Sequence, residues 1–419
     1  MLRSFVDGFG EAHDQLPMAQ RAVAGHPEEL ARLNAWLEDW SRNNPPYLGM
    51  NWKCGQEASI RVMHLILAHL ILSGFDTPPT PALRAVLHLH LKRIAPTIRY
   101  AIGQSNNHGT SEAAALFVGG HFLSGPEGAR WARQGRRWLE DRAAELIAPD
   151  GTFSQYSVVY HRLMLDTYAF AEAFRRHRGL PAFSARLTDR LAAAATWLDQ
   201  MTDPDTGDAP NLGSNDGAQI LDLAGAGFRD FRPSVQWAMG LFADRRAYAA
   251  AGPWDQPALW HGIDPARPVA PERQSISLDS GGIHVLRQGS AVAYLRYPRF
   301  RFRPCQADAL HLDLWLEGQA VFGDAGTYSY NVSPEDTAYF NGTVSHNTVT
   351  FDGRDQMPRL GRFLFGAWLK AHDVVRVTRA GETLRAAAAY RDRQGATHAR
   401  QVTLAPGHLR VEDRIAGFR

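Results

Sequence analysis

The sequence predicts an α+β protein with two domains, a helical one followed by an antiparallel β-domain. Its 419 residues are more than one ordinary hydrophobic core accommodates. Apolar residues recur with helical periodicity up to about residue 262, and after residue 274 they alternate with period two. The proline-rich segment 252–274 lacks periodicity and is typical of a linker. We therefore expect a helical domain at 1–262 and a β-domain at 263–419.

Helical periodicity predicts a series of helices in the first domain. Gly74, followed by Pro78 and Pro79, predicts a clear helix end. Gly, Asn and Pro gather in the joints, which also hold more aromatic side chains than plain linkers need. The expected helices are 34–42, 56–72, 82–102, 110–123, 127–147, 157–177, 185–201 and 234–250.

The second domain shows strand patterns. GIHVLR and AVAYLRYP flank a turn at 288–290, which predicts a β-hairpin. In DALHLDLWLEG the leucines share one face, and His311, Asp313 and Trp315 take the other. The chain stops at Arg419 directly after a strand, so we expect the β-domain to be incomplete at its C-terminus.

Composition narrows the class of protein. A net charge of +2 gives no reason to expect a nucleic-acid partner, and it leaves the oligomeric state open. Cys54 and Cys305 match no metal-binding spacing, so we expect buried thiols. The longest apolar run, near 62–72, is too short to span a membrane. The first 15 residues lack the apolar core of a signal peptide, which predicts a cytoplasmic protein or a chain without its natural N-terminus.

The segment GMNWKCGQEASIR offers the first candidate binding residues. Glu57 and Arg61 are four residues apart, so they share one stripe of an otherwise apolar helix. Such a stripe either lines a polar cleft or forms an internal ion pair. An aromatic side chain before the helix could stack on a sugar face. The candidates for substrate binding are Asn51, Trp52, Gln56, Glu57 and Arg61.

The segment QSNNHG places Asn106, Asn107 and His108 before an alanine-rich helix. The free N–H groups of a helix N-terminus favour anions. A loop with a helix cap would need only one such residue. Three such residues in a row favour a site that binds a carboxylic acid as strongly as they favour a helix cap.

Two further joints carry polar groups. In DGTFSQYSVVYH, Tyr156 and Tyr160 are four residues apart and His161 follows. Tyrosine can donate and accept a proton if its pKa is tuned, and the alternative is a packed aromatic residue. In PNLGSNDG, Asn215 and Asp216 either form an Asx turn or face a ligand.

The β-domain adds cationic and metal-binding residue types. Arg301 and Arg303 alternate with Phe, which predicts a strand with one basic face that either binds an anion or forms a solvated edge. His311, Asp324 and His346 are the residue types of a zinc site, although their spacing matches no metal signature.

Together these segments resemble the heparinase II/III-like polysaccharide lyase superfamily. The most specific matches are ADALHLDLW, GDAGTYSYN and SHNTVTFDGRDQM, and GMNWKCGQEASIR, NNHG and DGTFSQYSVVYH follow in the right order. The resemblance spans about residues 45–370. It implies an N-terminal incomplete (α/α) toroid of helical hairpins, an antiparallel β-sandwich and a cleft between them. It also implies a bacterial protein of the periplasm or cell envelope, associated with exopolysaccharide.

The implied activity is cleavage of a uronate-containing polysaccharide by β-elimination. The C5 proton of a uronate is not acidic while the neighbouring carboxylate is charged, so that charge must be neutralised. The resemblance implies that Asn107 with His108 does this, and that Tyr160 acts as base, acid or both. No cofactor is required for this chemistry.

The sequence departs from the family at one motif. Where relatives carry H-x-H-A-D-A-L, this chain has PCQADAL, with Pro304 and Gln306 in place of the histidines. In the family the first histidine contributes to catalysis and the second to a structural zinc site. We expect His311 to compensate as a catalytic residue. The replacement argues against zinc, for which His311, Asp324 and His346 are the candidate ligands. The resemblance also implies that the first helical hairpins are missing.

Two other functions stay open. One is a glycan-binding or exopolysaccharide-assembly protein that kept the cleft and lost the chemistry, which the missing histidines favour. The other is a glycoside hydrolase, which needs two opposed carboxylates, and Glu57 and Asp216 are the candidates.

Overall fold

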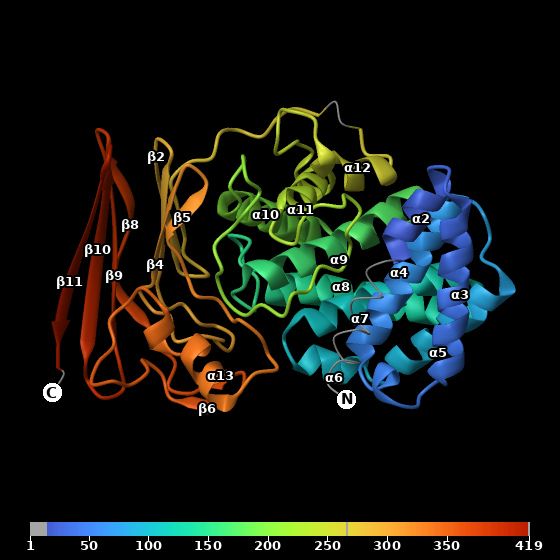
Figure 1. The fold of residues 1–419 in the computed structure, drawn as a ribbon, viewed down its shortest axis with the longest axis horizontal. Helices are drawn as coiled ribbons and strands as arrows, with labels where there is room; N and C mark the ends of the chain where they lie inside the picture. Colours follow the sequence, from blue (N-terminus) through green and yellow to red (C-terminus); the bar gives the residue numbers. More distant parts are fainter. Residues whose placement is uncertain (1–14, 265–266, 418–419) are drawn as a thin grey trace.

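The computed structural model describes residues 15–264 and 267–417 (Figure 1). Helices form the first part of the chain and antiparallel sheets form the last part, as the sequence predicted. Residues 1–14 lie outside the described residues. They make up nearly all of the N-terminal segment whose sequence lacks the apolar core of a signal peptide. Within the described ranges, no helix combines the length and the apolar character needed to cross a bilayer.

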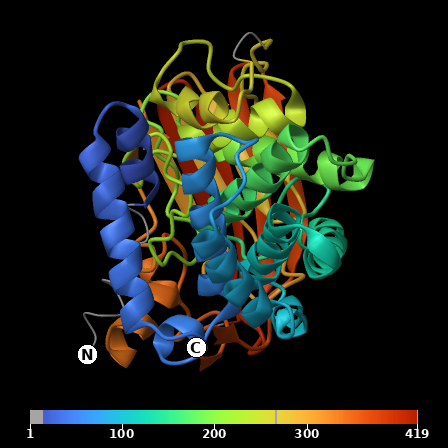
Figure 2. The same ribbon diagram turned by 90° about the vertical axis from the view of Figure 1, so that its right-hand side faces the viewer.

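The helical part consists of helices that pack around α7. Figure 2 shows this part in front of the sheets. This central helix contacts α4, α5, α8 and α9. The elements are α2 (Gln15–Val23), α3 (Pro27–Asn43), η1 (Met50–Trp52), α4 (Gly55–Ser73), α5 (Pro81–Ile94), α6 (Ile98–Gly103), α7 (Asn107–Leu123), α8 (Gly125–Leu146), α9 (Val158–His177), α10 (Ala185–Met201), α11 (Arg232–Ala238), η2 (Met239–Ala243), η3 (Pro253–Asp255) and α12 (Gln256–Trp260).

Small residues explain why α7 can lie at the centre. Nearly every residue of α7 is buried, and its sequence is rich in Ala and Gly. A Cβ atom at Gly120 would lie 2.5 Å from the carbonyl oxygen of Gly128, and one at Gly135 would lie 2.5 Å from that of Ala113. The backbones of α7 and α8 therefore touch, which only glycine allows at these points.

Two expected helices are broken or shortened in the structure, and a third, 34–42, begins earlier, as part of α3. The predicted helix 82–102 is divided into α5 and α6, because Pro96 lacks the N–H that would continue the first helix. The predicted helix 234–250 ends much earlier. It begins as α11, continues as the π-helical turn η2, and stops at Asp244, whose φ of 53° is left-handed.

Two antiparallel sheets form the second part. The first has the order β1-β2-β3-β4-β5 and the second the order β11-β10-β9-β8. Gln288 pairs with Ala291, so the predicted hairpin is confirmed. The strands are β1 (Ile276–Leu278), β2 (Ile283–Gln288), β3 (Ala291–Arg296), β4 (Leu312–Leu316), β5 (Gln319–Phe322), β8 (Ala371–Ala380), β9 (Thr383–Arg391), β10 (Thr397–Ala405) and β11 (His408–Ala416).

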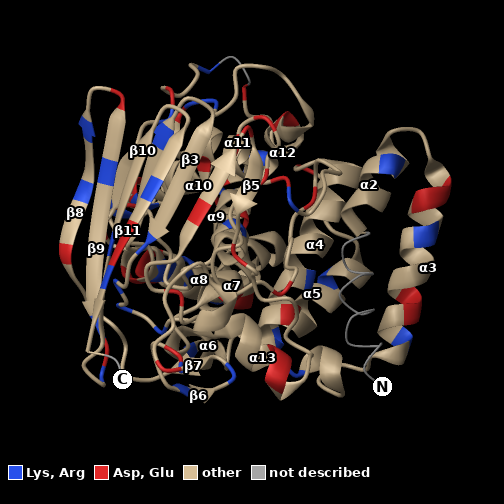
Figure 3. Ribbon diagram, turned by 60° about the vertical axis from the view of Figure 1, so that its left-hand side comes forward, with Lys and Arg blue, Asp and Glu red and all other residues tan. Residues whose placement is uncertain are grey.

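The connection between the sheets carries short elements of its own. These are α13 (Pro334–Asn341), η4 (Thr343–Ser345), and the paired strands β6 (Arg359–Gly361) and β7 (Leu364–Phe365). In Figures 1 and 3, α13 and β6 lie near each other at one end of the molecule. Figure 3 also shows acidic and basic residues interspersed along α3.

The first sheet lies between the second sheet and the helices (Figure 1). On β2, Ile283 and Val285 join the core of the helical part, whereas Leu286 joins the core between the two sheets. Both faces of the sheet are therefore buried at β2, which explains the apolar run in this strand. The expected linker 252–274 contains η3 and α12, and we retain a domain boundary at 262/263 as a proposal.

Candidate active site

The residues that lead into α9 connect three parts of the chain. The backbone N–H of Asn107 donates to Oε1 of Gln155 at 2.8 Å. The backbone N–H groups of Arg301 and Phe302 donate to the Tyr156 hydroxyl at 2.8 and 3.1 Å. This joint therefore holds the first turn of α7 against a loop of the β-domain.

Tyr160 lies in the first turn of α9, where Ser157 is the N-cap and accepts a hydrogen bond from its backbone N–H. The Tyr160 hydroxyl donates to Oδ2 of Asp216 at 2.8 Å and lies 3.0 Å from the Tyr330 hydroxyl. Burial, the Asp216 carboxylate and Tyr330 raise the pKa of Tyr160 well above its ordinary value. The phenol is therefore protonated at neutral pH, and Asp216 is placed to accept its proton.

Asp216 is held in place by its own turn. Its Oδ1 accepts from the Ala218 backbone N–H at 3.0 Å, and Oδ1 of Asn215 accepts from that of Gly217 at 2.8 Å. The Asx-turn alternative is thus correct for both residues. The second oxygen of Asp216 remains available to Tyr160, so the turn aims the carboxylate.

Tyr330 is a member of the cluster that the sequence did not predict. It lies in the segment GDAGTYSYN, 170 residues after Tyr160 in the chain. Burial raises the pKa of its hydroxyl above the ordinary value. Polar aromatic residues in this segment were a usable signal, but nothing local indicated which tyrosine reaches Tyr160.

In the first turn of α7, one polar residue caps the helix and the next two have other surroundings. Asn106 is the N-cap, and its Oδ1 accepts from the His108 backbone N–H at 3.1 Å. Among the hydrogen bonds of residues 15–264 and 267–417, none engages the side-chain amide of Asn107. Burial and the positive charge of Arg303 lower the pKa of His108 to about 4, so its imidazole is neutral at pH 7. The exposed Arg303 has no ion-pair partner within those ranges.

The candidate residues around α4 are largely occupied by structural contacts. Trp52 is only 3% exposed and packs against His90, with ring centroids 4.5 Å apart, and against Trp40. The expectation that Trp52 stacks on a sugar is therefore wrong, because its faces are covered by other rings. Gln56 is buried, and its Nε2 donates to the Ser111 hydroxyl at 3.2 Å.

Arg61 does not form the expected ion pair with Glu57 within the described part of the chain. Its guanidinium donates to the backbone oxygen of Asn51 and to Nε2 of His90, and lies 5.0 Å from the Trp40 ring centroid. Arg61 is therefore a structural residue of the helical part. Asn51 and Glu57 are half-buried, and burial raises the pKa of Glu57.

His161 and Tyr156 also differ from expectation. His161 is 1% exposed, stacks on Trp197 at 4.3 Å and bonds the Ala194 carbonyl. One residue corresponds to about 100° around a helix, so His161 points towards α10 while the buried Tyr160 points towards Asp216 and Tyr330. Tyr156 is 4% exposed, and its hydroxyl accepts hydrogen bonds from the backbone N–H groups of Arg301 and Phe302. Neither residue is placed to bind substrate.

The Arg/Phe alternation does not form the predicted strand. Residues 300–305 are an irregular loop. Arg301 forms an exposed ion pair with Glu145 at 2.6 Å, which leaves Arg303 as the available cation of this loop.

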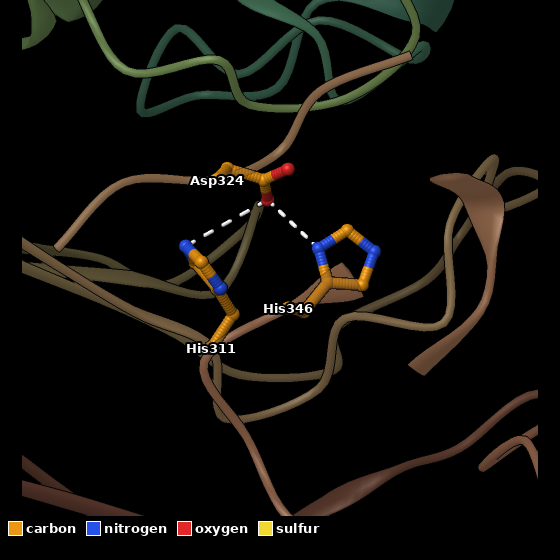
Figure 4. Close-up of side chains that lie close together, drawn as sticks. All are labelled: His311, Asp324 and His346. Atoms are coloured by element: carbon orange, nitrogen blue, oxygen red, sulfur yellow. Dashed lines mark hydrogen bonds and ion pairs between the residues drawn. The ribbon is translucent and has the colours of Figure 1, made fainter. Parts of the chain in front are cut away.

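His311, Asp324 and His346 do come together, as Figure 4 shows. His346 Nδ1 lies 2.9 Å from Oδ2 of Asp324, and His311 Nε2 lies 3.6 Å from the same oxygen and 3.1 Å from Oδ2 of Asp313. Burial lowers the pKa of His311, but the two carboxylates raise it more, so the net shift is upward.

The donor types in this cluster suit zinc, but the hydrogen bonding does not. The Asn347 backbone N–H donates to Nδ1 of His311 at 2.9 Å, so Nε2 carries the ring proton and points at the carboxylates. A metal at Nε2 would require that proton on Nδ1, where the N–H of Asn347 already points. Both ring nitrogens of His311 are therefore engaged, by Asn347 and by the carboxylates, whereas Nε2 of the buried His346 has no hydrogen-bond partner among the described residues. The buried Gln306 bonds the Gly326 carbonyl at 3.4 Å and takes no part in it.

His311 is also wrong as a substitute for the missing catalytic histidine. It is 1% exposed and enclosed by Asp313, Asp324 and Asn347. It cannot reach a substrate from this position.

Comparisons with known proteins agree with this architecture. Residues 270–418 match the family model described as heparinase II/III-like, C-terminal. A crystal structure of heparinase III superposes with a TM-score of 0.66 and 19% identity, over 95% of this chain and 61% of that one. Heparan sulfate lyase HepC from Pedobacter heparinus gives a TM-score of 0.59 and 21% identity, over 96% of this chain and 60% of that one. No curated protein sequence matches the chain.

The chain spans about three fifths of the length of these solved structures. Identities of this size establish the fold alone, whereas the family model covers the β-domain directly. Residues 270–418 are therefore similar to the heparinase II/III-like C-terminal family, and the chain has the fold of heparinase III, with helical hairpins followed by a β-sandwich.

Proposed function

We propose that the protein is a polysaccharide lyase that cleaves a uronate-containing anionic polysaccharide by β-elimination. One observation carries the proposal. The protonated hydroxyl of Tyr160 is bonded to Asp216 and lies beside Tyr330, where the helical part meets the β-domain. The joint before α9 ties the same region to Asn107. By family resemblance, we also propose a periplasmic or cell-envelope location.

In the first step, the substrate carboxylate is neutralised. The amide of Asn107 donates to it, and the neutral imidazole of His108 can donate one N–H. The positive charge of Arg303, which depresses the pKa of His108, also favours a bound anion. Withdrawal of the carboxylate's negative charge makes the C5 proton acidic enough to remove.

In the second step, Tyr160 transfers protons. Its oxygen takes the C5 proton while its own proton passes to Asp216. The electrons of the C5–H bond form the C4–C5 double bond, and the bond from C4 to the leaving oxygen breaks. Tyr160 then protonates that oxygen and regains a proton from Asp216, so the C5 proton is balanced by the new hydroxyl.

A second candidate function is glycan binding without turnover. Pro304 and Gln306 stand where the family has histidines, and His311 is enclosed, so none of these three positions supplies an imidazole to assist Tyr160. A hydrolase is supported less well, because the Asp216 carboxylate is engaged with Tyr160.

The test is incubation with alginate, heparan sulfate, hyaluronan and bacterial exopolysaccharides, followed by the ultraviolet absorbance of the unsaturated product. Tyr160→Phe removes the proton carrier, so we expect the rate to fall about 10²- to 10⁴-fold. Asp216→Asn keeps the turn but cannot accept the proton, and should cause a loss of similar direction.

Tyr100→Phe is the matched control, because Tyr100 is 77% exposed on α6 and should leave the rate unchanged. Absence of product with every polymer would contradict the lyase proposal. Binding that survives Tyr160→Phe, with no turnover by either protein, would select the glycan-binding function.

A further inference from the structure

A groove beside Tyr330 is not used by the chemistry above. It has a volume of about 690 Å³, within the range of small-ligand sites. Its walls come from the segment before α13, the start of that helix, and the β6–β7 hairpin. The lining residues are Tyr330, Asn331, Val332, Pro334, Thr337, Arg359, Leu360, Gly361 and Arg362.

The groove is cationic. Arg359 and Arg362 line it, and no carboxylate does. Within residues 15–264 and 267–417 neither arginine has an ion-pair partner, and Arg362 makes one long hydrogen bond, 3.4 Å to Oδ1 of Asn331. Two guanidinium groups with unused donors favour a carboxylate or sulfate, which their planar fork can bind with two parallel hydrogen bonds.

An aromatic pair adjoins the groove through its lining residue Tyr330. The Tyr330 and Phe363 rings meet edge to face, with centroids 4.8 Å apart, and the Arg362 guanidinium lies 5.4 Å from the Phe363 centroid. Phe363 remains 38% exposed. Aromatic faces beside cations match a sugar ring, which has apolar C–H faces and charged substituents at its edge.

The groove shares one residue, Tyr330, with the candidate active site. Tyr330 forms part of its wall, and the hydroxyl of the same residue lies 3.0 Å from that of Tyr160. A polysaccharide whose reacting unit lies at Tyr160 would therefore extend its next units past Tyr330.

We propose that this groove, the Arg359–Arg362 groove, is a subsite for an acidic sugar unit that neighbours the reacting unit in the same polysaccharide. The ligand class is a sugar bearing a carboxylate or a sulfate. The proposal rests on the proposed function, because it takes Tyr160 as the point where the chain reacts. The subsite selects charged polymers over neutral ones.

The experiment measures binding by calorimetry, so that it does not depend on turnover. Size-defined oligosaccharides of heparan sulfate, hyaluronan and alginate are titrated into the Tyr160→Phe protein, with and without Arg359→Ala/Arg362→Ala. We expect the double substitution to raise the Kd of the bound oligosaccharide at least about tenfold at low salt, because two charge-assisted contacts are lost. Higher salt should shrink that difference.

The matched control is Arg385→Ala/Arg393→Ala, two exposed arginines of the outer sheet without ion pairs in the described chain, and it should leave the Kd unchanged. Carboxyl-reduced and desulfated oligosaccharides distinguish the two anions, since removal of the recognised group should mimic the double substitution. Unfolding temperatures within a degree or two confirm that the variants are folded.

Equal binding by the parent and the Arg359→Ala/Arg362→Ala protein, or binding of no oligosaccharide by either, would overturn the subsite. The proposed function fails separately. If binding depends on the two arginines but the unsubstituted enzyme forms no product, the lyase proposal is refuted and the subsite proposal stands. If the enzyme turns over a polymer and the double substitution does not change the KM, the subsite proposal is refuted and the lyase proposal stands.

Discussion

Asn106 and Asn107 are adjacent residues with different roles. The Asn106 side chain caps α7, whereas no hydrogen bond of the described residues engages the side-chain amide of Asn107. A cap stabilises the helix N-terminus, and an unused amide donor serves a ligand. Asn106 therefore stabilises the start of α7, and Asn107 has the ligand-binding role that we propose above.

Asn106→Ala is expected to lower the free energy of unfolding by about 1 kcal/mol, and Asn106→Asp should restore it. Asn107→Ala should change stability little and lower kcat/KM by about 10²-fold or more, as loss of an anion-stabilising donor does. Urea unfolding and initial rates of product absorbance measure the two effects. Equal losses of stability at both positions would refute this division of roles.

Glu112 is a buried acid at the contact between α7 and α4. It is 3% exposed, one carboxylate oxygen has no hydrogen-bond partner, and a Cβ atom at Gly55 would collide with it. Burial raises the pKa of Glu112 from its ordinary 4.5 to about 8, although Arg93 opposes the shift. Glu112 is therefore neutral in the folded protein at pH 7.

This shift predicts a pH dependence of stability. Between pH 4.5 and about 8 the folded state keeps a proton on Glu112 that the unfolded chain has lost, so stability falls as pH rises. The loss is at most about 1.4 kcal/mol per pH unit and ends above the folded pKa. Glu112→Gln should flatten the slope, measured by urea unfolding at several pH values. The exposed Glu382→Gln should retain it, and an unchanged slope in Glu112→Gln would contradict the assignment.

At the scale of elements, the pairing of α7 with α8 depends on glycine residues, which have no Cβ atom. A Cβ atom at Gly135 would meet backbone atoms of Phe117 and Ala113, which cannot move aside as a side chain could.

Gly135→Ala is expected to destabilise the protein by about 1–3 kcal/mol, because the helices must separate. Gly103→Ala is the control, since a Cβ atom there meets nothing within 4 Å and alanine favours a helix. Thermal unfolding compares the two. A Gly135→Ala protein as stable as the parent would show that the helix contact is more adaptable than its geometry indicates.

For the whole molecule, the helices and the first sheet share one core. Leu278, Ile283, Val285, Tyr294 and Trp315 pack with the buried residues of the helical part. A core of this kind couples the two parts, so neither should unfold alone.

We expect a single cooperative unfolding transition, with equal calorimetric and van't Hoff enthalpies. Val285→Ala, at a fully buried position, should lower stability by about 2 kcal/mol and shift the helix and aromatic circular dichroism signals together. Val321→Ala, 52% exposed on β5, should change neither. Two separate transitions, with only one moved by Val285→Ala, would instead support independent domains.

The sequence by itself determined the order of helices and strands, the hairpin at β2 and β3, and the cap at α7. These features depend on neighbouring residues: the periodicity of apolar side chains, the turn at 288–290, and the ability of Asn106 to accept a nearby backbone N–H. The motif resemblance also fixed the fold class, which the comparison with heparinase III confirms.

Tertiary structure decided which of the candidate residues meet. Tyr160, Asp216 and Tyr330 come together although 56 and 170 residues separate Tyr160 from the other two. Packing also enclosed Trp52 and His311, whose residue types had favoured sugar and proton chemistry. Local patterns cannot predict these outcomes, because the reach and burial of a side chain depend on elements that are distant in the chain.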